Sequence, residues 1–232
     1  MAAVYTLLAG LARERATGSV SVRHTGKVYL RDGRVTHLES PRAPSVERLL
    51  TARARPEGYT RAELQFCVVG AVLDAAYFVL PAELPVDRPK FRPGERPPLN
   101  ARLEFEPAWL VRECARRRAQ LAQIWPSAEL DEAPVTPAAR LPGHRAMLSR
   151  LEWEILVSAD RLATPADLAD RLGQPAYTVL LAIRRMAAAG LLVAPLPPRR
   201  RGRGLDRAVP PAVPMSDPTI LAAVKKALED LA

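Results

Sequence analysis

Two hydrophobic periods follow one another at the start of the chain. Residues 1–11 are apolar and run into the charged residues 13–15, which predicts an amphipathic helix that is too short to span a membrane. Residues 17–38 then alternate between apolar and polar side chains in three short runs, with turns at Gly26 and Gly33. Alternation with a period of two between glycine turns is typical of hairpins. We therefore expect a three-stranded antiparallel meander with one helix packed on it.

Helical spacing returns after Pro44. Apolar side chains at residues 46–50 predict a short helix that Ser45 can cap. A capping box at Thr60–Glu63 marks the start of a second helix, because the hydroxyl can accept from a free backbone N–H while the glutamate reaches back. That helix is apolar on most sides between residues 64 and 79, which predicts central burial.

Two proline-rich stretches frame a basic helix. Residues 81–108 contain one possible strand at Leu103–Glu106, and Pro107 then introduces a helix that ends near Ile124. This helix has an apolar stripe that is expected to face inward. The helix also carries four arginines close together, beside a single glutamate. Residues 127–143 are rich in proline again, which predicts a linker.

The first strand and the helices that follow it resemble a known family. Residues 17–22 (TGSVSV), residues 28–33, the apolar helix at 64–80 and Arg116–Arg118 in the basic helix resemble the PATAN domain family. The resemblance implies a regulatory adaptor domain, often attached to receiver or DNA-binding modules, and it carries over no catalytic residues. A helix-covered meander of no particular family is the alternative.

Three closely spaced helices are predicted between Leu148 and Leu192. The first ends near Asp160, and the second begins at residues 164–167 (Thr-Pro-Ala-Asp), which all suit the first turn of a helix. Residues 173–175 (Gly-Gln-Pro) form a tight turn, after which the third helix runs to Gly190. This is the helix-turn-helix arrangement, whose second helix can enter the DNA major groove.

The end of the third helix resembles winged-helix regulators. In those proteins a glycine closes the recognition helix and an apolar triplet begins the first strand of the wing, as Gly190 and residues 191–193 would do here. Residues 196–198 (Leu-Pro-Pro) follow, and no apolar run supplies a clear return strand. The sequence therefore predicts an incomplete wing.

The outward face of the third helix carries the candidate DNA contacts. Val179, Ile183 and Met186 are expected inward on a helical wheel. Five side chains are then expected outward: Tyr177, Thr178, Leu181, Arg184 and Arg185. Arginine can bond guanine or phosphate, threonine can meet a base edge or phosphate, and leucine can touch a thymine methyl. The face formed by Tyr177, Leu181 and Ala188 suits a protein interface equally well.

Positive charge is distributed unevenly along the chain. The net charge of +9 and the pI near 10.2 favour a polyanionic partner, double-stranded DNA above all. Residues 148–190, however, hold five arginines against five acidic residues, which lowers the DNA affinity expected of the helix-turn-helix alone. Further positive charge lies downstream at Arg199, Arg200, Arg201 and Arg203, on an arm that resembles an AT-hook and implies minor-groove contacts. A phosphate-binding or merely solvated basic linker is the alternative.

A last helix is predicted over residues 216–232, after a second proline-rich linker. Its apolar stripe comprises Ile220, Leu221, Val224, Leu228 and Leu231. Such a stripe needs a cover, which its own domain, a second copy of the chain or another protein can provide. We expect these residues to bind a partner, either in a homodimer or on a different protein.

The sequence offers no motif for catalysis, metal binding or cofactor binding. It contains no phosphate-binding glycine loop, no dinucleotide fingerprint and no nucleophile elbow, so we expect no enzyme activity and no cofactor. His24, His37 and His144 are scattered, which predicts surface or loop positions rather than metal ligands. Cys67 and Cys114 lie in apolar runs, where a thiol behaves as a small buried hydrophobe, and this fits a protein of the reducing cytoplasm without a membrane anchor.

These patterns predict an α+β chain in five segments. They are a PATAN-like α+β domain (1–126), a proline-rich linker (127–143), a winged-helix-like helix-turn-helix (144–195), a basic, proline-rich linker (196–215) and an amphipathic helix (216–232). The favoured function is a DNA-binding transcriptional regulator whose first domain receives a signal or a partner. The alternative is a non-enzymatic signalling adaptor whose helix-turn-helix does not bind DNA.

Overall fold

The computed structural model describes residues 3–52, 58–80, 89–98, 103–140, 143 and 145–193. All of them belong to one compact unit. The arginines at 199–203 and the helix expected at 216–232 lie outside the described residues. Within the described part, an antiparallel sheet with helices is followed by further helices, which confirms the α+β class.

The predicted meander is present and gains a fourth strand. Strands β1 (Gly18–Val22), β2 (Gly26–Arg31) and β3 (Arg34–Glu39) pair in sequence, and β4 (Lys90–Pro93) pairs with β1, so the order is β3-β2-β1-β4. The strand expected at residues 103–106 is only a bridge between Phe105 and Val35. Strand β4 was not predicted from the sequence because prolines surround it. It can form nevertheless, because it is an edge strand, and one side of its backbone needs no hydrogen-bond partner.

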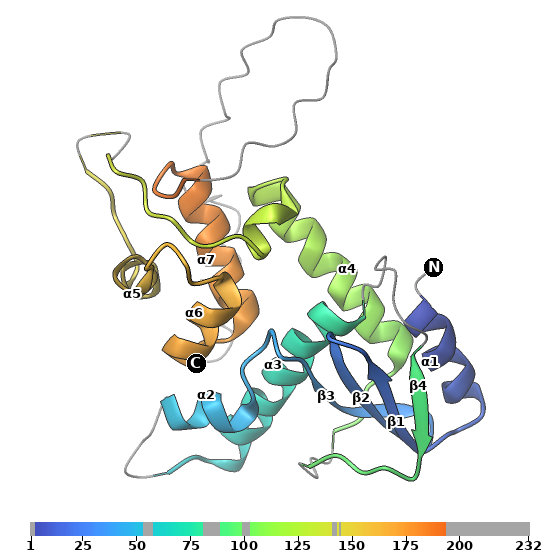
Figure 1. The fold of residues 1–232 in the computed structure, drawn as a ribbon. Helices are drawn as coiled ribbons and strands as arrows, with labels where there is room; N and C mark the ends of the chain where they lie inside the picture. Colours follow the sequence, from blue (N-terminus) through green and yellow to red (C-terminus); the bar gives the residue numbers. More distant parts are fainter. Residues whose placement is uncertain are drawn as a thin grey trace, which may run out of the picture. The chain divides into compact units, whose positions relative to one another are not determined.

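Three helices border the sheet: α1 (Ala3–Arg13), α3 (Arg61–Val79) and α4 (Pro107–Ile124) (Figure 1). The expected capping box of Thr60 is formed and starts α3. Central burial, however, begins only at Val68, and Phe66 is exposed. Helix α3 contacts β2 and β3 and also the short helix α2 (Val46–Ala52). By length and composition alone α3 could cross a membrane, a property that central helices of soluble proteins share.

The three helices expected between Leu148 and Leu192 are present, and together they are called the helix-turn-helix below. It consists of α5 (Arg150–Ser158), α6 (Pro165–Leu172) and α7 (Ala176–Ala188). Thr164 and Asp167 form a capping box at the start of α6, and Gly173 ends that helix in the left-handed conformation at φ 58°. Each of these signals depends only on residues within one helical turn, which explains why sequence alone predicts them.

The expected linker at residues 127–143 is instead packed against the helix-turn-helix. A 3-10 helix, η1 (Ala128–Asp131), follows α4, and Leu130 and Val135 are buried in the core of the helical region. Pro137 forms an isolated bridge with Leu192, so the chain upstream of α5 pairs with the residues just after α7, and any return strand of the expected wing falls outside the described residues. The linker interpretation is therefore wrong for the described part of this stretch.

No gap separates the two expected domains either. A single hydrophobic cluster joins side chains from both, including Tyr77 and Phe78 of α3, Leu121 of α4, and Ile155 and Ile183 of the helix-turn-helix. Helix α7 contacts α4 as well as α5 and α6. The orientation of α7 is consequently determined by two packing surfaces, and this determines which of its residues are accessible.

Candidate functional site

The outer face of α7 is narrower than the helical wheel predicts. Among the five residues expected to point outward, Thr178 and Arg185 are exposed and Leu181 is half-buried. Tyr177 and Arg184 are buried, so their expected outward placement is wrong. The wheel assumed one buried side, whereas α7 packs on α5 and α6 on one side and on α4 and η1 on another.

Tyr177 lies at the start of α7, where it contacts α3 and α4. Its backbone N–H donates to Asp74 Oδ2 at 3.1 Å, and Asp74 Oδ1 accepts from Arg117 Nη1 at 2.8 Å. The Arg117 guanidinium lies 4.5 Å from the centroid of the Tyr177 ring, and the Tyr177 hydroxyl donates to Gln120 Oε1 at 2.8 Å. Burial raises the pKa of Asp74, while the charge of Arg117 and the α7 amides act in the opposite direction.

Arg184 lies two turns further along α7 and bonds the segment that follows α4. Its Nε and Nη2 donate to the two carboxylate oxygens of Asp131 at 2.9 and 2.7 Å, and its Nη1 donates to the carbonyl of Trp125. The Tyr77 hydroxyl donates to the same carboxylate at 3.2 Å. A bidentate pair of this kind fixes both distance and orientation. Arg184 therefore holds α7 against η1.

Asp74–Arg117 and Asp131–Arg184 are thus two buried ion pairs. A free helix N-terminus attracts phosphate because its N–H groups carry partial positive charge. At the start of α7 the carboxylate of Asp74 occupies that position, and the charge of Arg184 is neutralised inside the protein. Two of the five α7 residues expected to contact DNA, Tyr177 and Arg184, are thus engaged by the chain itself.

Sequence analysis missed Asp74 and Asp131 as functional residues. One signal was available for Asp74, since a carboxylate in the middle of an apolar helix needs a charged or hydrogen-bonding partner when it is buried. Asp131 gave no such signal, because it lies in a stretch with the composition of a linker. Arg117 stood out only as one of several arginines in α4.

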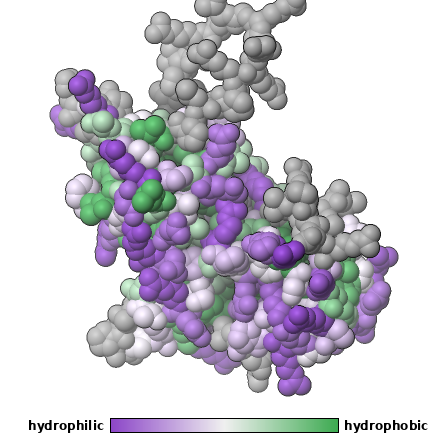
Figure 2. All heavy atoms as spheres, in the orientation of Figure 1, coloured by the Kyte–Doolittle hydropathy of each residue, from purple (hydrophilic) through white to green (hydrophobic). Residues whose placement is uncertain are grey.

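A second feature of the helix-turn-helix is an apolar surface on the side of α5. Trp153 and Val157 are 59% and 66% exposed on α5, and Leu162, in the turn after it, is 80% exposed. Met147, before the helix, is 96% exposed. Figure 2 shows hydrophobic spheres among the hydrophilic ones over this part of the molecule. Large apolar side chains that gather on a surface mark interaction sites more often than isolated ones do.

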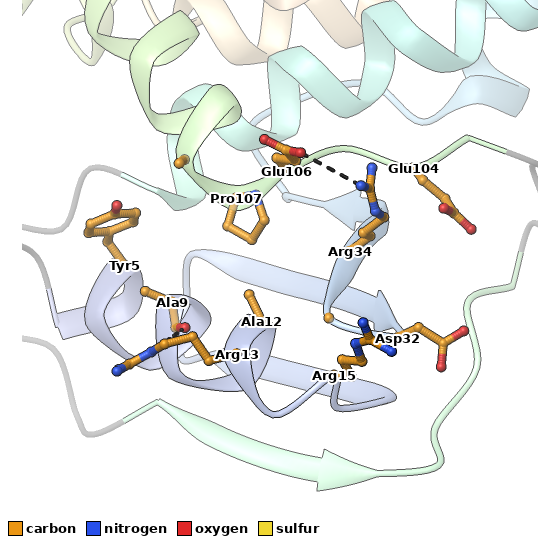
Figure 3. A pocket seen from close by; sticks show the side chains of 12 residues that line it. Tyr5, Ala9, Ala12, Arg13, Arg15, Asp32, Arg34, Glu104, Glu106 and Pro107 are labelled. Atoms are coloured by element: carbon orange, nitrogen blue, oxygen red, sulfur yellow. Dashed lines mark hydrogen bonds and ion pairs between the residues drawn. The ribbon is translucent and has the colours of Figure 1, made fainter.

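A cavity of about 770 Å³ lies elsewhere, between α1, the β2–β3 turn and the start of α4 (Figure 3). Its charged groups are already balanced: Arg34 turns toward Glu106, with an N···O distance of 3.6 Å, and Glu104 pairs with Arg31 at 3.2 Å. Arg13 and Arg15 lie on its rim. The lining holds three arginines (Arg13, Arg15 and Arg34) and three acidic residues (Asp32, Glu104 and Glu106), so its formal charges cancel.

A smaller cavity of about 290 Å³ lies beside β3 and is lined in part by His37. The expectation that His37 is a surface or loop residue is wrong, because it lies buried within β3. Burial lowers its pKa, and its Nδ1 makes no hydrogen bond in the described structure. That nitrogen is also closed to solvent, so a ligand in the cavity could not reach it in this conformation.

The described residues contain no group of three His, Cys, Asp or Glu side chains placed to hold a metal ion. Cys114 is buried, which raises the pKa of its thiol to about 11, and Cys67 is half-buried. Comparison of the chain with family models, with curated proteins and with solved structures finds no match. The interpretation of the site therefore rests on the contacts described above.

Proposed function

We propose that this chain is a non-enzymatic regulatory adaptor that acts through protein–protein contacts, with the helix-turn-helix as a packing and docking module. The observation that carries the proposal is the burial of Arg184 in its pair with Asp131. A residue expected to touch DNA instead joins α7 to η1 and to the end of α4. The resemblance of residues 4–126 to PATAN adaptor domains points to the same function.

The surface chemistry of the helix-turn-helix supports this assignment. Residues 148–190 carry no net charge, whereas DNA affinity depends on a positive surface that neutralises phosphates. The apolar side chains on and beside α5 are instead the kind found at the centre of protein interfaces, where tryptophan and methionine are enriched and charges are depleted.

A DNA-binding transcriptional regulator is the second candidate. Thr178 and Arg185 lie exposed on α7, and the arginine arm at residues 199–203 could add phosphate or minor-groove contacts. In this alternative the recognition surface is restricted to the outer edge of α7 and the arm. Binding would then need both elements, because residues 148–190 have no excess of positive charge.

A salt titration of the full chain against genomic DNA fragments tests the two functions. The adaptor proposal predicts weak binding that is equal on all fragments and disappears as salt rises. Replacing the four arm arginines with alanine should then flatten the salt slope by about three to four units. Binding to one fragment that persists at high salt, and that Arg185→Ala reduces on this fragment alone, would overturn the proposal in favour of the DNA regulator.

A further inference from the structure

The cavity beside β3 has a mostly apolar wall. Helix α3 contacts both β3 and α2 (Figure 1), and the cavity of about 290 Å³ lies where these three elements meet. Ala71 and Ala75 of α3 line it and are buried, so small side chains on a core helix leave the space open. Leu38, Pro44 and Val46 extend the apolar wall. A cavity of about 150 Å³ can hold one benzene ring, so this one suits an apolar body of about ten non-hydrogen atoms.

The charged groups around this cavity are of one sign. Glu39 and Glu47 line it, whereas its described lining contains no lysine or arginine. Neither carboxylate pairs with a lysine or arginine in the part of the chain that the structure describes, and Lys27, the cross-strand neighbour of Glu39, pairs with Glu95 instead. His37 Nε2 lies 3.5 Å from Glu39 Oε1, but burial lowers the pKa of His37, so the imidazole is uncharged at neutral pH. The lining is therefore negative.

We infer that this cavity binds a small organic cation, whose ammonium group meets Glu39 and Glu47 and whose apolar body enters the space beside Ala71 and Ala75. The inference goes beyond the proposed function, because it assigns a small-molecule ligand to the α+β part of the chain. Ligand sites commonly combine apolar walls with a few charged groups that determine which ligand binds. Two carboxylates repel an anion, and a neutral molecule gains the apolar contacts without the ion pairs.

Helix α2 connects this cavity to the helix-turn-helix. Glu47 lines the cavity, and the next residue, Arg48, donates from Nε to the carbonyl oxygen of Asp170 in α6 at 2.8 Å. At the other end of α2, Ala52 lies so close to Gly173 that a Cβ on the glycine would collide with it. A ligand that packs against the start of α2 therefore acts on a helix whose contacts extend to α6.

NMR titrations of the full chain at low salt with three probes of similar shape test the inference. The probes are phenethylamine, phenethyl alcohol and phenylacetate, which share a phenyl ring and differ in charge. The amine should bind with a dissociation constant that is roughly millimolar or tighter. The alcohol should bind about threefold to tenfold more weakly, because it forms neither ion pair, and phenylacetate more weakly again. Equal binding of the amine and the alcohol, or no binding of the amine, would overturn the inference.

Substitutions in the lining separate the two parts of the site. Glu39→Gln combined with Glu47→Gln should remove the preference for the amine and leave alcohol binding unchanged, whereas Glu14→Gln, at another exposed glutamate, should change neither. Ala75→Leu reduces the cavity and should weaken both probes about tenfold or more, and Ala71→Leu replaces it if thermal melts show that the first variant does not fold. A preference for the amine that survives the two glutamine substitutions, or probe binding that a folded leucine variant leaves unchanged, would refute the site. The DNA titration does not depend on these outcomes, so the ligand site can fail while the adaptor function stands.

Discussion

Replacing Arg184 with methionine is expected to destabilise the protein more than any exposed substitution on α7. Methionine keeps much of the aliphatic volume but removes three hydrogen bonds, two to Asp131 and one to the Trp125 carbonyl. Asp131 then keeps its bond from the Tyr77 hydroxyl and loses its charge partner. An ionised carboxylate in a buried site without a cation carries a large desolvation penalty.

The size of the effect follows from this geometry. Removing one partner of a buried ion pair costs about 3–5 kcal/mol, and for a unit of this length the melting temperature should fall by about 6–20 °C. Arg185→Met, one residue along and exposed, should change stability by less than about 0.5 kcal/mol. The double variant Arg184→Met with Asp131→Leu should recover most of the loss, because no unpaired charge is left.

Chemical denaturation and thermal melts of the four proteins measure these differences. If Arg184→Met melts within about 2 °C of the unchanged chain, Arg184 is not held in a buried pair and does not anchor α7 to η1. Failure of the double variant to regain stability would show that shape, and not charge, dominates at this position.

Three further predictions concern single positions. Gly173→Ala should lower stability by more than about 1 kcal/mol, because its φ of 58° suits glycine and an added Cβ would collide with α2; unchanged melts would contradict this. Thr164→Ala should cost about 1 kcal/mol at neutral pH. The hydroxyl and backbone N–H of Thr164 donate to the Asp167 carboxylate and hold its pKa below the ordinary value. The part of the loss that comes from the bond between the hydroxyl and the carboxylate should therefore disappear as the pH falls through the folded-state pKa, whereas the bond from the Asp167 N–H to the hydroxyl does not titrate, and melts at several pH values check this. A thiol reagent should label Cys67 in the folded protein and Cys114 only after denaturation, because burial raises the pKa of Cys114 to about 11, and mass spectrometry would detect early labelling of Cys114 if this is wrong.

The sequence predicted those features that depend on neighbouring residues. The three-stranded meander, the capping box at Thr60, the helix start at Thr164 and the helix end at Gly173 all depend on alternation or on contacts within one turn. Such signals are local, so they are visible before any tertiary contact is known. Strand β4 gave no equivalent signal, because four residues among prolines show no measurable period.

The candidate site was harder to predict for a physical reason. A helical wheel identifies one apolar side, but it cannot show that a second side of α7 will meet α4 and η1. The burial of Tyr177 and Arg184 depends on Asp74 and Asp131, which lie more than fifty residues away in sequence. An amphipathic pattern that includes arginine and tyrosine is ambiguous, because both side chains can be buried when they find partners.

The bridge between Pro137 and Leu192 has a consequence for how this protein can be divided or recombined. Two backbone bonds, Val193 N–H to the Thr136 carbonyl at 2.8 Å and Ala138 N–H to the Leu191 carbonyl at 2.9 Å, join the chain before α5 to the chain after α7. A fragment that starts at residue 144 loses these partners and leaves part of the helical core uncovered. The helix-turn-helix therefore cannot be transferred to another protein alone. A stable fusion protein, or an evolutionary exchange of this module, must include the segment from Ala128 onward.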